Sequence, residues 1–306
     1  MPTNSSPHKS GFVAVIGKPN VGKSTLVNAL VGTKIAIVSP KPQTTRRVIR
    51  GILSRADTQI IFVDTPGIHL LARARAPLLN RAMVQAAENA VNDVDAIVFV
   101  TDGARAPTDE DVRIGEMLNA QARAPVLIAL NKMDLLKPED VQRVTEAHWA
   151  LASHADWMRV SATRGENLDK LLDQIIARLP AGPEYFPADQ VTDQTLPAIA
   201  AELIREQVLL KTRQEVPHAA AVAIEQWEER RADLTHIAAT IFVERDSQKG
   251  ILIGARGAML KQIGQAAHAE IEAWVGHPVF LELWVKVWDD WREQPNRLRE
   301  LGLVEE

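Results

Sequence analysis

Cysteine is absent from this chain of 306 residues. Its absence excludes disulfide bonds, thiolate metal sites and a cysteine nucleophile, and it fits a reducing compartment. The eight histidines show no spacing typical of metal ligands. No apolar run reaches the roughly 18 residues of a membrane-spanning helix, and the polar stretch 1–10 is predicted to be a disordered tail, not a signal peptide. We therefore expect a cytoplasmic protein.

The charge of the whole chain is also low. A net charge of −4 provides no overall basic field of the kind that attracts nucleic acid. Residues 1–180 carry 22 Lys and Arg against 18 Asp and Glu, whereas residues 195–306 carry 13 against 18. Hydrophobic residues make up 46% of the chain, enough for real cores, and the length suggests two domains of ordinary size.

From residue 11 to about residue 180, short apolar runs alternate with stretches of helical periodicity. Alternation of this kind predicts an α/β domain with a mostly parallel sheet, because strands buried on both faces are almost wholly apolar. The expected strands are 12–16, 59–63, 96–100, 126–130 and 157–160, with helices at 24–31, 78–90 and 109–119 among the connections.

A stretch with three prolines and a glycine, 180–187, cannot continue a helix and predicts a linker over 181–196. A second domain is expected over 197–306. Its first helix has Thr195 as a cap, and Ile199, Leu203 and Leu210 are predicted to share one face. Alternating residues predict that the domain ends in a strand at 281–288, and we expect the tryptophans of that strand to be packed in a core.

The first motif of chemical significance has the spacing Gly-x4-Gly-Lys-Ser and lies between an expected strand and an expected helix. In such a loop the backbone N–H groups point at phosphate oxygens, and the helix N-terminus adds its dipole. Lys23 should reach the β- and γ-phosphates and the Ser24 hydroxyl should bind Mg²⁺. The motif alone does not distinguish ATP from GTP. The nucleotide contacts expected here are Gly17, Asn20, Val21, Gly22, Lys23, Ser24 and Thr25.

The second motif, Asn-Lys-Met-Asp at 131–134, predicts which base is bound. The Asp134 carboxylate can accept hydrogen bonds from guanine N1–H and the 2-amino group, whereas adenine has neither donor on that edge. Asn131 would connect this loop to the phosphate loop, and the Lys132 stem would cover the base. Asn and Asp after a strand can also simply cap a helix, but about 110 residues after a phosphate loop they favour GTP. Ser161 and Ala162 are expected to form a further base-contacting loop.

Two segments between these motifs are predicted to sense the γ-phosphate. Asp64 should hold Mg²⁺ through water, and the Gly67 N–H should meet the γ-phosphate. The irregular stretch 40–47 offers Thr44 and Thr45, of which we favour Thr45 as the threonine that completes the Mg²⁺ shell; a plain connecting loop is the alternative. We therefore expect Lys23, Thr45 and Gly67 to be catalytic, and Ser24, Thr45 and Asp64 to hold the metal.

Ile68 stands where many regulatory GTPases have a water-orienting glutamine. Isoleucine can neither donate nor accept a hydrogen bond. We therefore expect intrinsic hydrolysis to be slow.

A Gly-x-x-Gly loop at 254–257 lies between two expected helices in the second domain and resembles the loop of a KH RNA-binding module. The glycines allow a sugar-phosphate backbone to approach closely. Because the domain is acidic, a local basic patch is expected rather than a broad one. The RNA contacts expected are Lys249, Ile253, Gly254, Ala255, Arg256, Gly257 and Lys261, with Arg256 as the main phosphate contact. Trp284 and Trp288 could instead stack on bases.

Together these motifs resemble the Era family of bacterial GTPases. The resemblance rests on 17–25, 42–46 preceded by Ser39, 64–67, 131–134, 243–245 with 248–249, 253–257 and 281–287, and it spans nearly the whole chain from Gly11. It implies a P-loop GTPase domain over 11–180 followed by an α+β KH domain of type II. It also implies GTP hydrolysis with Mg²⁺, a monomeric protein that binds the 3′ end of 16S rRNA and assists assembly of the 30S subunit, and peripheral contact with the inner membrane. In related GTPases an asparagine at the place of Asn20 helps to bind K⁺.

The chain departs from the family in three places. Ala255 and Met259 stand where lysine is frequent, and Trp288 stands where a polar or basic residue is frequent. Three alternatives stay open at this point. One is a scaffold that holds GTP only as a structural ligand, another is a GTPase whose second domain binds a protein or a membrane surface, and the third is a P-loop ATPase.

Overall fold

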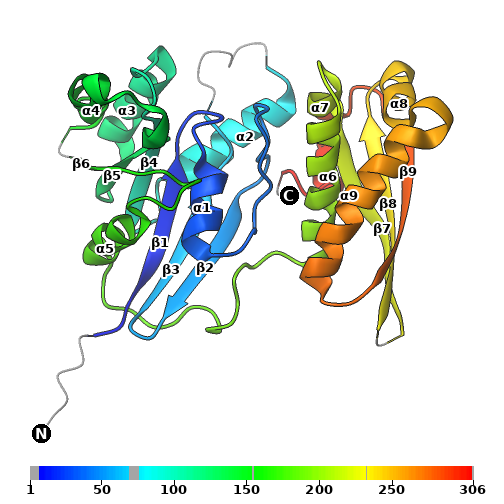
Figure 1. The fold of residues 1–306 in the computed structure, drawn as a ribbon, viewed down its shortest axis with the longest axis horizontal. Coiled ribbons are helices and arrows are strands. Elements are labelled where there is room, and N and C mark those ends of the chain that lie inside the picture. Colours follow the sequence, from blue (N-terminus) through cyan, green and yellow to red (C-terminus); the bar gives the residue numbers. More distant parts are fainter. Residues whose placement is uncertain (1–6, 69–75, 154, 232, 305–306) are drawn as a thin grey trace, which may run out of the picture. The chain divides into compact units, whose positions relative to one another are not determined.

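The computed structural model describes residues 7–68, 76–153, 155–231 and 233–304 (Figure 1). The chain forms two compact units. Unit 1 consists of 1–36, 45–76 and 83–193, and unit 2 consists of 37–44, 77–82 and 194–306. Two short segments that precede residue 180 therefore belong with the C-terminal unit, which no local sequence pattern indicated.

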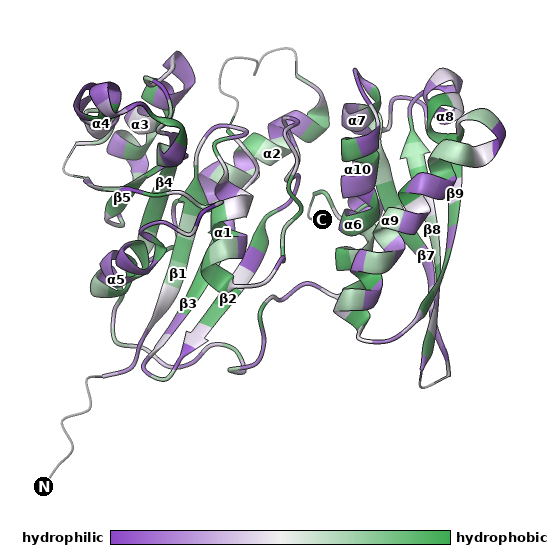
Figure 2. Cartoon of the chain, in the orientation of Figure 1, coloured by the Kyte–Doolittle hydropathy of each residue, from purple (hydrophilic) through white to green (hydrophobic). Residues whose placement is uncertain are grey.

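Unit 1 is built on a sheet of six strands in the order β2-β3-β1-β4-β5-β6. All neighbouring strands are parallel except β2, which is antiparallel to β3, so the predicted mostly parallel sheet is confirmed. The strands are β1 (Lys9–Ile16), β2 (Ile49–Arg55), β3 (Thr58–Asp64), β4 (Ala96–Asp102), β5 (Val126–Asn131) and β6 (Asp156–Arg159). Figure 2 shows the predominantly apolar colouring of the central strands.

Helices cover the two faces of this sheet. One face packs against α2 and α3 around a core that includes Phe99, Ile114 and Ile128, and α1, which contacts α5, packs on β1, β2 and β3. The helices are α1 (Lys23–Val31), α2 (Leu78–Asn89), α3 (Asp109–Gln121), α4 (Val141–Trp149) and α5 (Leu168–Arg178), of which α2 belongs to unit 1 only from Met83 onward. Thr108 and Asp111 form a capping box that begins α3.

Three features of unit 1 differ from the sequence prediction. Strand β2 was not predicted, and its pairing with β3 runs from Ile49 opposite Asp64 to Arg55 opposite Thr58. Strand β1 begins at Lys9, inside the stretch predicted as a tail, and the Lys9 ammonium donates to the Ile176 carbonyl at 2.8 Å. Residues 1–6 of that stretch lie outside the described residues.

The proline-rich stretch after α5 contains no helix and packs on unit 1. The side chain of Gln59, fully buried, accepts from the N–H groups of Tyr185 and Phe186 and donates to the Phe186 carbonyl at 2.7 Å. A buried amide is stable only when its donor and acceptor are paired, and Gln59 meets this condition by holding the stretch against β3.

Unit 2 is an α+β fold with a three-stranded sheet in the order β7-β8-β9. Strand β8 is antiparallel to β7 and parallel to β9. Its elements are α6 (Leu196–Lys211), α7 (Val216–Ala219), β7 (Ala221–Arg231), β8 (Leu234–Val243), α8 (Asp246–Ile253), α9 (Ala258–Val275), β9 (Val279–Val287) and α10 (Pro295–Glu300). Helices α6 and α9 pack against each other, α6 contacts β7 and α9 contacts β9.

The amphipathic pattern of α9 is confirmed, since Ile263, Ala267 and Ile271 are buried in the core of unit 2. Helix α6 differs from its prediction. Ile199 and Leu203 are buried, but Leu210 is 50% exposed, and every residue from Ile199 to Leu209 is buried. A helix that is buried all round needs a cover on each side.

The tryptophan of β9, Trp284, does not lie in the core. Trp284 is 45% exposed on the side of the sheet opposite the helices. Trp288, just after β9, stacks on Phe242 at 3.6 Å, and the Arg297 guanidinium lies 3.9 Å from its ring centre. The expected core role is therefore wrong for Trp284. Among the described residues, no helix is both long and apolar enough to cross a membrane.

Candidate functional site

The chemical motifs of unit 1 follow the carboxyl ends of four parallel strands. The phosphate loop follows β1, Asp64 ends β3, Asn131 ends β5, and Ser161 comes shortly after β6. Carboxyl ends of parallel strands meet at one edge of the sheet, which is where ligands bind in open α/β folds. The sheet topology therefore brings together four segments that are spread over nearly half of the chain.

The phosphate loop has the compact geometry that its spacing predicts. Gly22 has φ 95°, and a Cβ atom there would lie 2.4 Å from the Nδ2 atom of Asn131, so both the backbone conformation and the space require glycine. The Lys23 ammonium donates to the carbonyls of Gly17 and Lys18, each at 3.1 Å. Burial lowers the pKa of Lys23 to about 8, with Asp64 opposing that shift. An anion in this loop would stabilise the charged form of Lys23.

A second lysine, Lys18, fixes the phosphate loop by contacts with the start of α3. The Lys18 ammonium donates to the carboxylate of the fully buried Asp111 at 2.5 Å and to the Thr108 hydroxyl at 2.8 Å. Asp111 belongs to the capping box of α3, so this contact anchors the phosphate loop to the start of another helix. The sequence did not predict this pair. Lys18 occupies a position of the motif that any residue can fill, and its partner becomes evident only when α3 is placed beside the phosphate loop.

Three oxygen-bearing side chains meet beside the start of α1. The Ser24 hydroxyl donates to Asp64 Oδ2 at 2.6 Å and lies 2.9 Å from the Thr45 hydroxyl. Asp64 is fully buried, and its Oδ1 atom has no hydrogen-bond partner among the described residues. Burial raises the pKa of Asp64 to about 6, against the lowering effect of Lys23 and of the bond from Ser24.

This donor set fits Mg²⁺. Mg²⁺ prefers hard oxygen ligands and commonly takes one or two protein groups together with phosphates and water. Two hydroxyls and a carboxylate that is incompletely paired match that preference. The three residues are the ones that the sequence predicted as metal ligands, and their role as ligands stays a prediction.

The hydroxyl of Thr44 does not join this group of oxygen-bearing side chains beside α1. Its hydroxyl donates to the Lys41 carbonyl at 2.7 Å and lies 2.7 Å from the Ser39 hydroxyl, so it closes the preceding loop. Thr45, and not Thr44, places its hydroxyl beside Ser24, and the nucleotide contact expected of Thr44 stays a prediction. The physical reason is that neighbouring residues of an extended chain point in opposite directions.

The Asn131 side chain connects three loops of the site. Its Nδ2 atom donates to the Val21 carbonyl at 2.9 Å, and its Oδ1 atom accepts from the Ala162 N–H at 3.0 Å. Lys132 adds two more contacts, because its ammonium donates to the Asn20 carbonyl at 2.6 Å and lies 3.2 Å from Asp102. The motif at 131–134 therefore holds the phosphate loop and the 161–162 loop in a fixed arrangement.

Asp134 keeps a carboxylate available at this place. Its side chain is 9% exposed, its Oδ2 atom lies 3.4 Å from the Arg164 guanidinium, and its Oδ1 atom has no hydrogen-bond partner among the described residues. Arg164 is itself largely exposed. A buried acceptor that is incompletely satisfied can take the paired donors of guanine at little cost.

Gly67 and Ile68 lie next to the phosphate loop. The Ile68 N–H donates to the Gly17 carbonyl at 3.2 Å, and a Cβ atom on Gly67 would lie 2.7 Å from Pro19. The Ile68 side chain is fully buried in the core beside α2 and α3. It therefore has no means of orienting a water molecule, as the sequence indicated.

Unit 2 contains a groove of about 540 Å³ between α9 and β9. Leu281 and Leu283 of β9 and Leu260 and Gly264 of α9 supply apolar surface, while Gln265 and His268 supply polar groups. His268 hydrogen bonds to the Val279 carbonyl at 2.8 Å, which fixes the orientation of its ring. An apolar floor with a few fixed polar groups suits the flat face and polar edge of a nucleobase.

The Gly-x-x-Gly loop connects α8 to α9, and Gly257 lies at the end of the groove. Gly254 has φ 70° and ψ 178°, and a Cβ atom there would lie 2.8 Å from the Cβ of Met259. Arg256 has φ 52° and is exposed, so its guanidinium is accessible at the tip of the loop. Lys261 lines the groove, and Lys249 lies on α8 before the loop.

Sequence analysis missed most of the residues that line the groove: Leu260, Gly264, Gln265, His268, Leu281 and Leu283. A helical spacing was present in the sequence, since 257, 261, 264 or 265 and 268 recur on one side of α9. Recognising that side as the wall of a groove required β9 to be placed beside it.

Comparisons with known proteins agree with both sites. Residues 12–132 match the family model described as 50S ribosome-binding GTPase, and residues 215–292 match the KH domain model. A solved structure of Era in complex with MgGDPNP and nucleotides 1506–1542 of 16S ribosomal RNA is 38% identical, with a TM-score of 0.92. A structure of an Era variant from Aquifex aeolicus bound to GDP and AlF4⁻ is also 38% identical, with a TM-score of 0.89.

Each of these two similarities covers 97% of this chain and 100% of the other. Both similarities extend over almost the whole length of the chain. The chain therefore belongs to the Era family of GTPases.

Proposed function

We propose that this protein binds and hydrolyses GTP with Mg²⁺, and that its GTP-bound form binds the 3′ end of 16S rRNA through unit 2 during assembly of the 30S subunit. The observation that carries this proposal is the similarity over 97% of the chain to an Era solved with MgGDPNP and a 16S rRNA segment. The two sites described above, one in each unit, would hold the Mg²⁺-bound nucleotide and the RNA.

Catalysis in unit 1 would consist of positioning and electrostatic stabilisation, with no covalent intermediate. Lys23 would hold the β- and γ-phosphates, and the Gly67 N–H would donate to the γ-phosphate. Ser24, Thr45 and Asp64 would hold Mg²⁺, which when bound supplies positive charge to the phosphate oxygens. Because Ile68 is buried and apolar, turnover without a partner should be slow.

Asn20 supports the proposal of a K⁺ site. Its backbone has φ 63° and its carbonyl is held by Lys132, so the phosphate loop presents it in a fixed position, exposed to solvent. A cation beside the leaving phosphate would act as an arginine finger does. Hydrolysis that is several-fold faster in KCl than in NaCl at equal ionic strength, with Asn20→Ala abolishing the difference, is the expected result; equal rates in both salts would refute it.

In unit 2 the RNA backbone would lie against the Gly-x-x-Gly loop, with Arg256 and Lys261 as phosphate contacts, and bases would enter the groove. KH modules hold about four nucleotides in this manner. A cytoplasmic location follows from a ribosomal partner, and peripheral contact with the inner membrane is a further part of the proposal.

The test is binding of the full chain to a short single-stranded RNA with the sequence of the 16S 3′ end. It is measured with a GTP analogue, with GDP and without nucleotide, at fixed salt. We expect tight binding only with the GTP analogue. Gly254→Asp should abolish it, and Gly276→Asp is the matched control, because Gly276 also has a positive φ, 81°, but lies at the far end of α9.

Other outcomes would separate the alternatives. RNA binding that is equal in all nucleotide states would refute the nucleotide control and leave an RNA-binding GTPase. No RNA binding in any state, or binding that survives Arg256→Glu, would refute the role of the groove and favour a protein or membrane partner for unit 2.

A further inference from the structure

The segment Ile37–Thr44 connects α1 of unit 1 to Thr45, yet it belongs to unit 2. We call this segment the docked segment. The chain leaves unit 1 after Ala36 and returns to it at Thr45, whose hydroxyl lies 2.9 Å from that of Ser24. A proposed metal ligand is thus the first residue after a stretch held by the RNA-binding unit.

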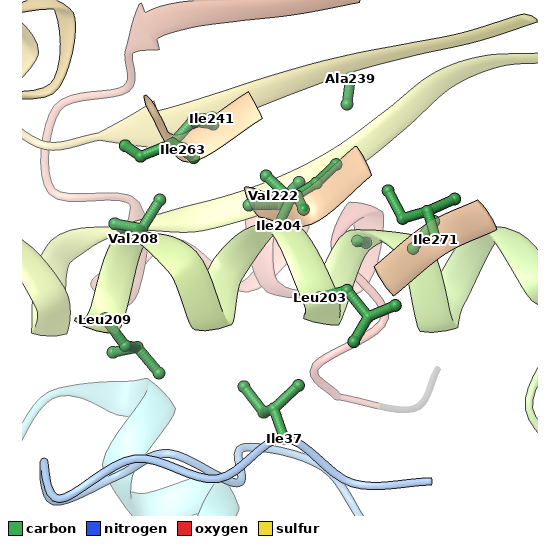
Figure 3. Close-up of a cluster of buried hydrophobic side chains, with 14 of the residues drawn as sticks. Ile37, Leu203, Ile204, Val208, Leu209, Val222, Ala239, Ile241, Ile263 and Ile271 are labelled. Carbon is green, nitrogen blue, oxygen red and sulfur yellow. The ribbon is translucent and has the colours of Figure 1, made fainter. Parts of the chain in front are cut away.

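The first attachment of the docked segment is apolar. Ile37 is 3% exposed and belongs to the core of unit 2. Figure 3 shows Leu203 and Leu209 of α6 pointing toward Ile37, while Ile204 and Val208 point to the opposite side, toward the sheet and α9. The docked segment therefore provides the second cover that a helix buried all round requires.

The second attachment is a set of hydrogen bonds from the start and the middle of the segment to α6 and its C-terminal cap. The Val38 N–H donates to Glu206 Oε1 at 2.7 Å. The Lys41 ammonium donates to the carbonyls of Leu209 and Thr212 at the C-terminal end of α6, where a positive charge interacts favourably with the helix dipole.

The third attachment is the most specific. The Arg205 guanidinium donates to the Thr44 carbonyl and pairs with Glu202, at 3.0 Å from Nε to Oε1 and 2.5 Å from Nη2 to Oε2. The side chain of Arg205 is 3% exposed and that of Glu202 is 10% exposed. A buried ion pair is seldom a net source of stability, since apolar residues of similar volume do as well. Because Arg205 also donates to the Thr44 carbonyl, directly before Thr45, the ion pair is placed to fix the position of Thr45.

The docked segment is also internally stiff. The Ser39 hydroxyl accepts from the Lys41 N–H at 3.1 Å and lies 2.7 Å from the Thr44 hydroxyl, which in turn donates to the Lys41 carbonyl. A segment closed by such bonds moves as one piece, so a shift of α6 is passed on to Thr44 and to the residue after it.

We propose that α6 of unit 2 positions Thr45 for Mg²⁺ through the docked segment, with Arg205 and Lys41 as positioning residues. This inference rests on the proposed function and on Thr45 as a ligand. Because coupling between two sites is reciprocal, the same contacts would carry the state of the nucleotide to the RNA-binding unit. The described contacts thus give a physical route for nucleotide control of RNA binding.

The experiment uses the full chain with Arg205→Met and Glu202→Gln combined, which removes the guanidinium without leaving a buried carboxylate charged and unpaired. The readout is the Mg²⁺ concentration that half-saturates binding of a GTP analogue. We expect it to rise on the order of tenfold, the effect of losing one charged hydrogen bond. GDP affinity in EDTA, where no metal needs Thr45, should stay unchanged. Lys41→Met, at a half-buried position, should also raise this half-saturating Mg²⁺ concentration, which we call the Mg²⁺ demand.

Two controls isolate the positional effect. Glu202→Gln alone keeps the Arg205 guanidinium on the Thr44 carbonyl and should leave the half-saturating Mg²⁺ concentration unchanged, although it lowers stability by removing the charged partner of Arg205. The pair Arg292→Met and Glu244→Gln removes another two-pronged ion pair of unit 2, with contacts of 2.9 and 2.6 Å, and should not change Mg²⁺ demand. The first double variant should also narrow the difference in RNA affinity between GTP-analogue and GDP states.

Three results would overturn the inference: unchanged Mg²⁺ demand in both Arg205 and Lys41 variants, an equal shift in the Arg292 control, or an equal loss of GDP affinity in EDTA. Each is read against a wild type that binds the GTP analogue with Mg²⁺ and binds RNA. A wild type that did neither would instead contradict the proposed function itself.

Discussion

At the scale of single residues, the base-reading end of the site depends on how each polar atom is used. Both polar atoms of the Asn131 side chain form hydrogen bonds with backbone groups of neighbouring loops, at Val21 and Ala162. Asp134, three residues later, keeps one oxygen without a partner among the described residues. Asn131 is therefore placed to organise the site, and Asp134 to choose the ligand.

Asp134→Asn should exchange the preferred base. The amide would present an N–H donor to guanine N1–H and so leave buried donors facing each other, which costs on the order of a hundredfold or more in affinity. Xanthine has a carbonyl where guanine has its 2-amino group, so XTP affinity should rise. Competition of GTP and XTP for a fluorescent nucleotide measures both changes. An unchanged preference for GTP would show that Asp134 does not contact the base.

At the scale of elements, α9 and β9 form the groove by close approach. Gly264 faces Leu283, whose Cδ1 atom would lie 3.2 Å from a Cβ atom on residue 264. Helix α9 continues for 18 residues in spite of this glycine, and glycine inside a helix costs about 1 kcal/mol relative to alanine. The glycine is thus explained by the width of the groove and not by the helix.

Gly264→Leu should therefore separate RNA binding from stability. The added side chain would enter the groove and lower RNA affinity by about tenfold or more, while better helix propensity offsets the close contact of the new Cβ atom with Leu283, so that the melting temperature changes by only a few degrees. RNA titration and thermal unfolding of the same preparation measure the two effects. Wild-type RNA affinity in this variant would place the bases outside the groove.

Helix α4 supplies a prediction on pH. His148 is fully buried, and its Nε2 atom lies 2.9 Å from the Arg105 carbonyl. Burial lowers the pKa of His148, and Lys18 adds to this, while the bond to Arg105 and the carboxylates of Asp111 and Asp102 oppose it. Below the ordinary pKa of 6.5 the unfolded chain takes up a proton that the folded chain refuses, so stability falls as pH falls.

His148→Gln should remove this part of the pH dependence. The wild type should lose more stability than the variant between pH 7.5 and 5.5, by at most about 1.4 kcal/mol per pH unit for one proton. Urea unfolding at a series of pH values measures the difference. Parallel curves for the two proteins would mean that His148 titrates normally in the folded state.

At the scale of the whole molecule, charge is distributed unevenly between the two parts of the chain. Residues 1–180 have a small positive balance, and residues 195–306, which contain the groove, have five more acidic than basic residues. Basic residues around the groove are few, chiefly Lys249, Arg256 and Lys261. RNA binding by unit 2 should therefore depend on a handful of phosphate contacts and on the groove.

The salt dependence of RNA binding should be correspondingly shallow. Three phosphate contacts on single-stranded RNA give a slope of about −2 in a plot of log K against log salt. Arg256→Gln should weaken binding and make the slope less negative by about 0.7. A slope of −5 or steeper would indicate a much larger basic footprint than these three residues provide.

Local patterns were sufficient for the parallel sheet, for the phosphate loop, for the 131–134 motif and for the helix–loop–helix around Gly254. Each of these depends on neighbours in sequence: buried strands are apolar, a phosphate loop needs glycine at fixed spacing, and an amphipathic helix repeats every three or four residues. Strand β2 was not predicted, because its residues alternate only weakly between apolar and polar and because its pairing partner, β3, follows after a turn.

What the sequence could not determine is what depends on contacts between distant residues. Lys18 with Asp111, Asn131 with Ala162 and Arg205 with Thr44 are each separated by 31 to 161 positions. The amino-acid sequence by itself determined which chemistry the chain carries, because that chemistry needs particular side chains at fixed local spacing. Only the tertiary structure decided that Ile37–Thr44 belongs with unit 2 and that α9 and β9 enclose a groove, because burial and packing arise only when the chain is folded.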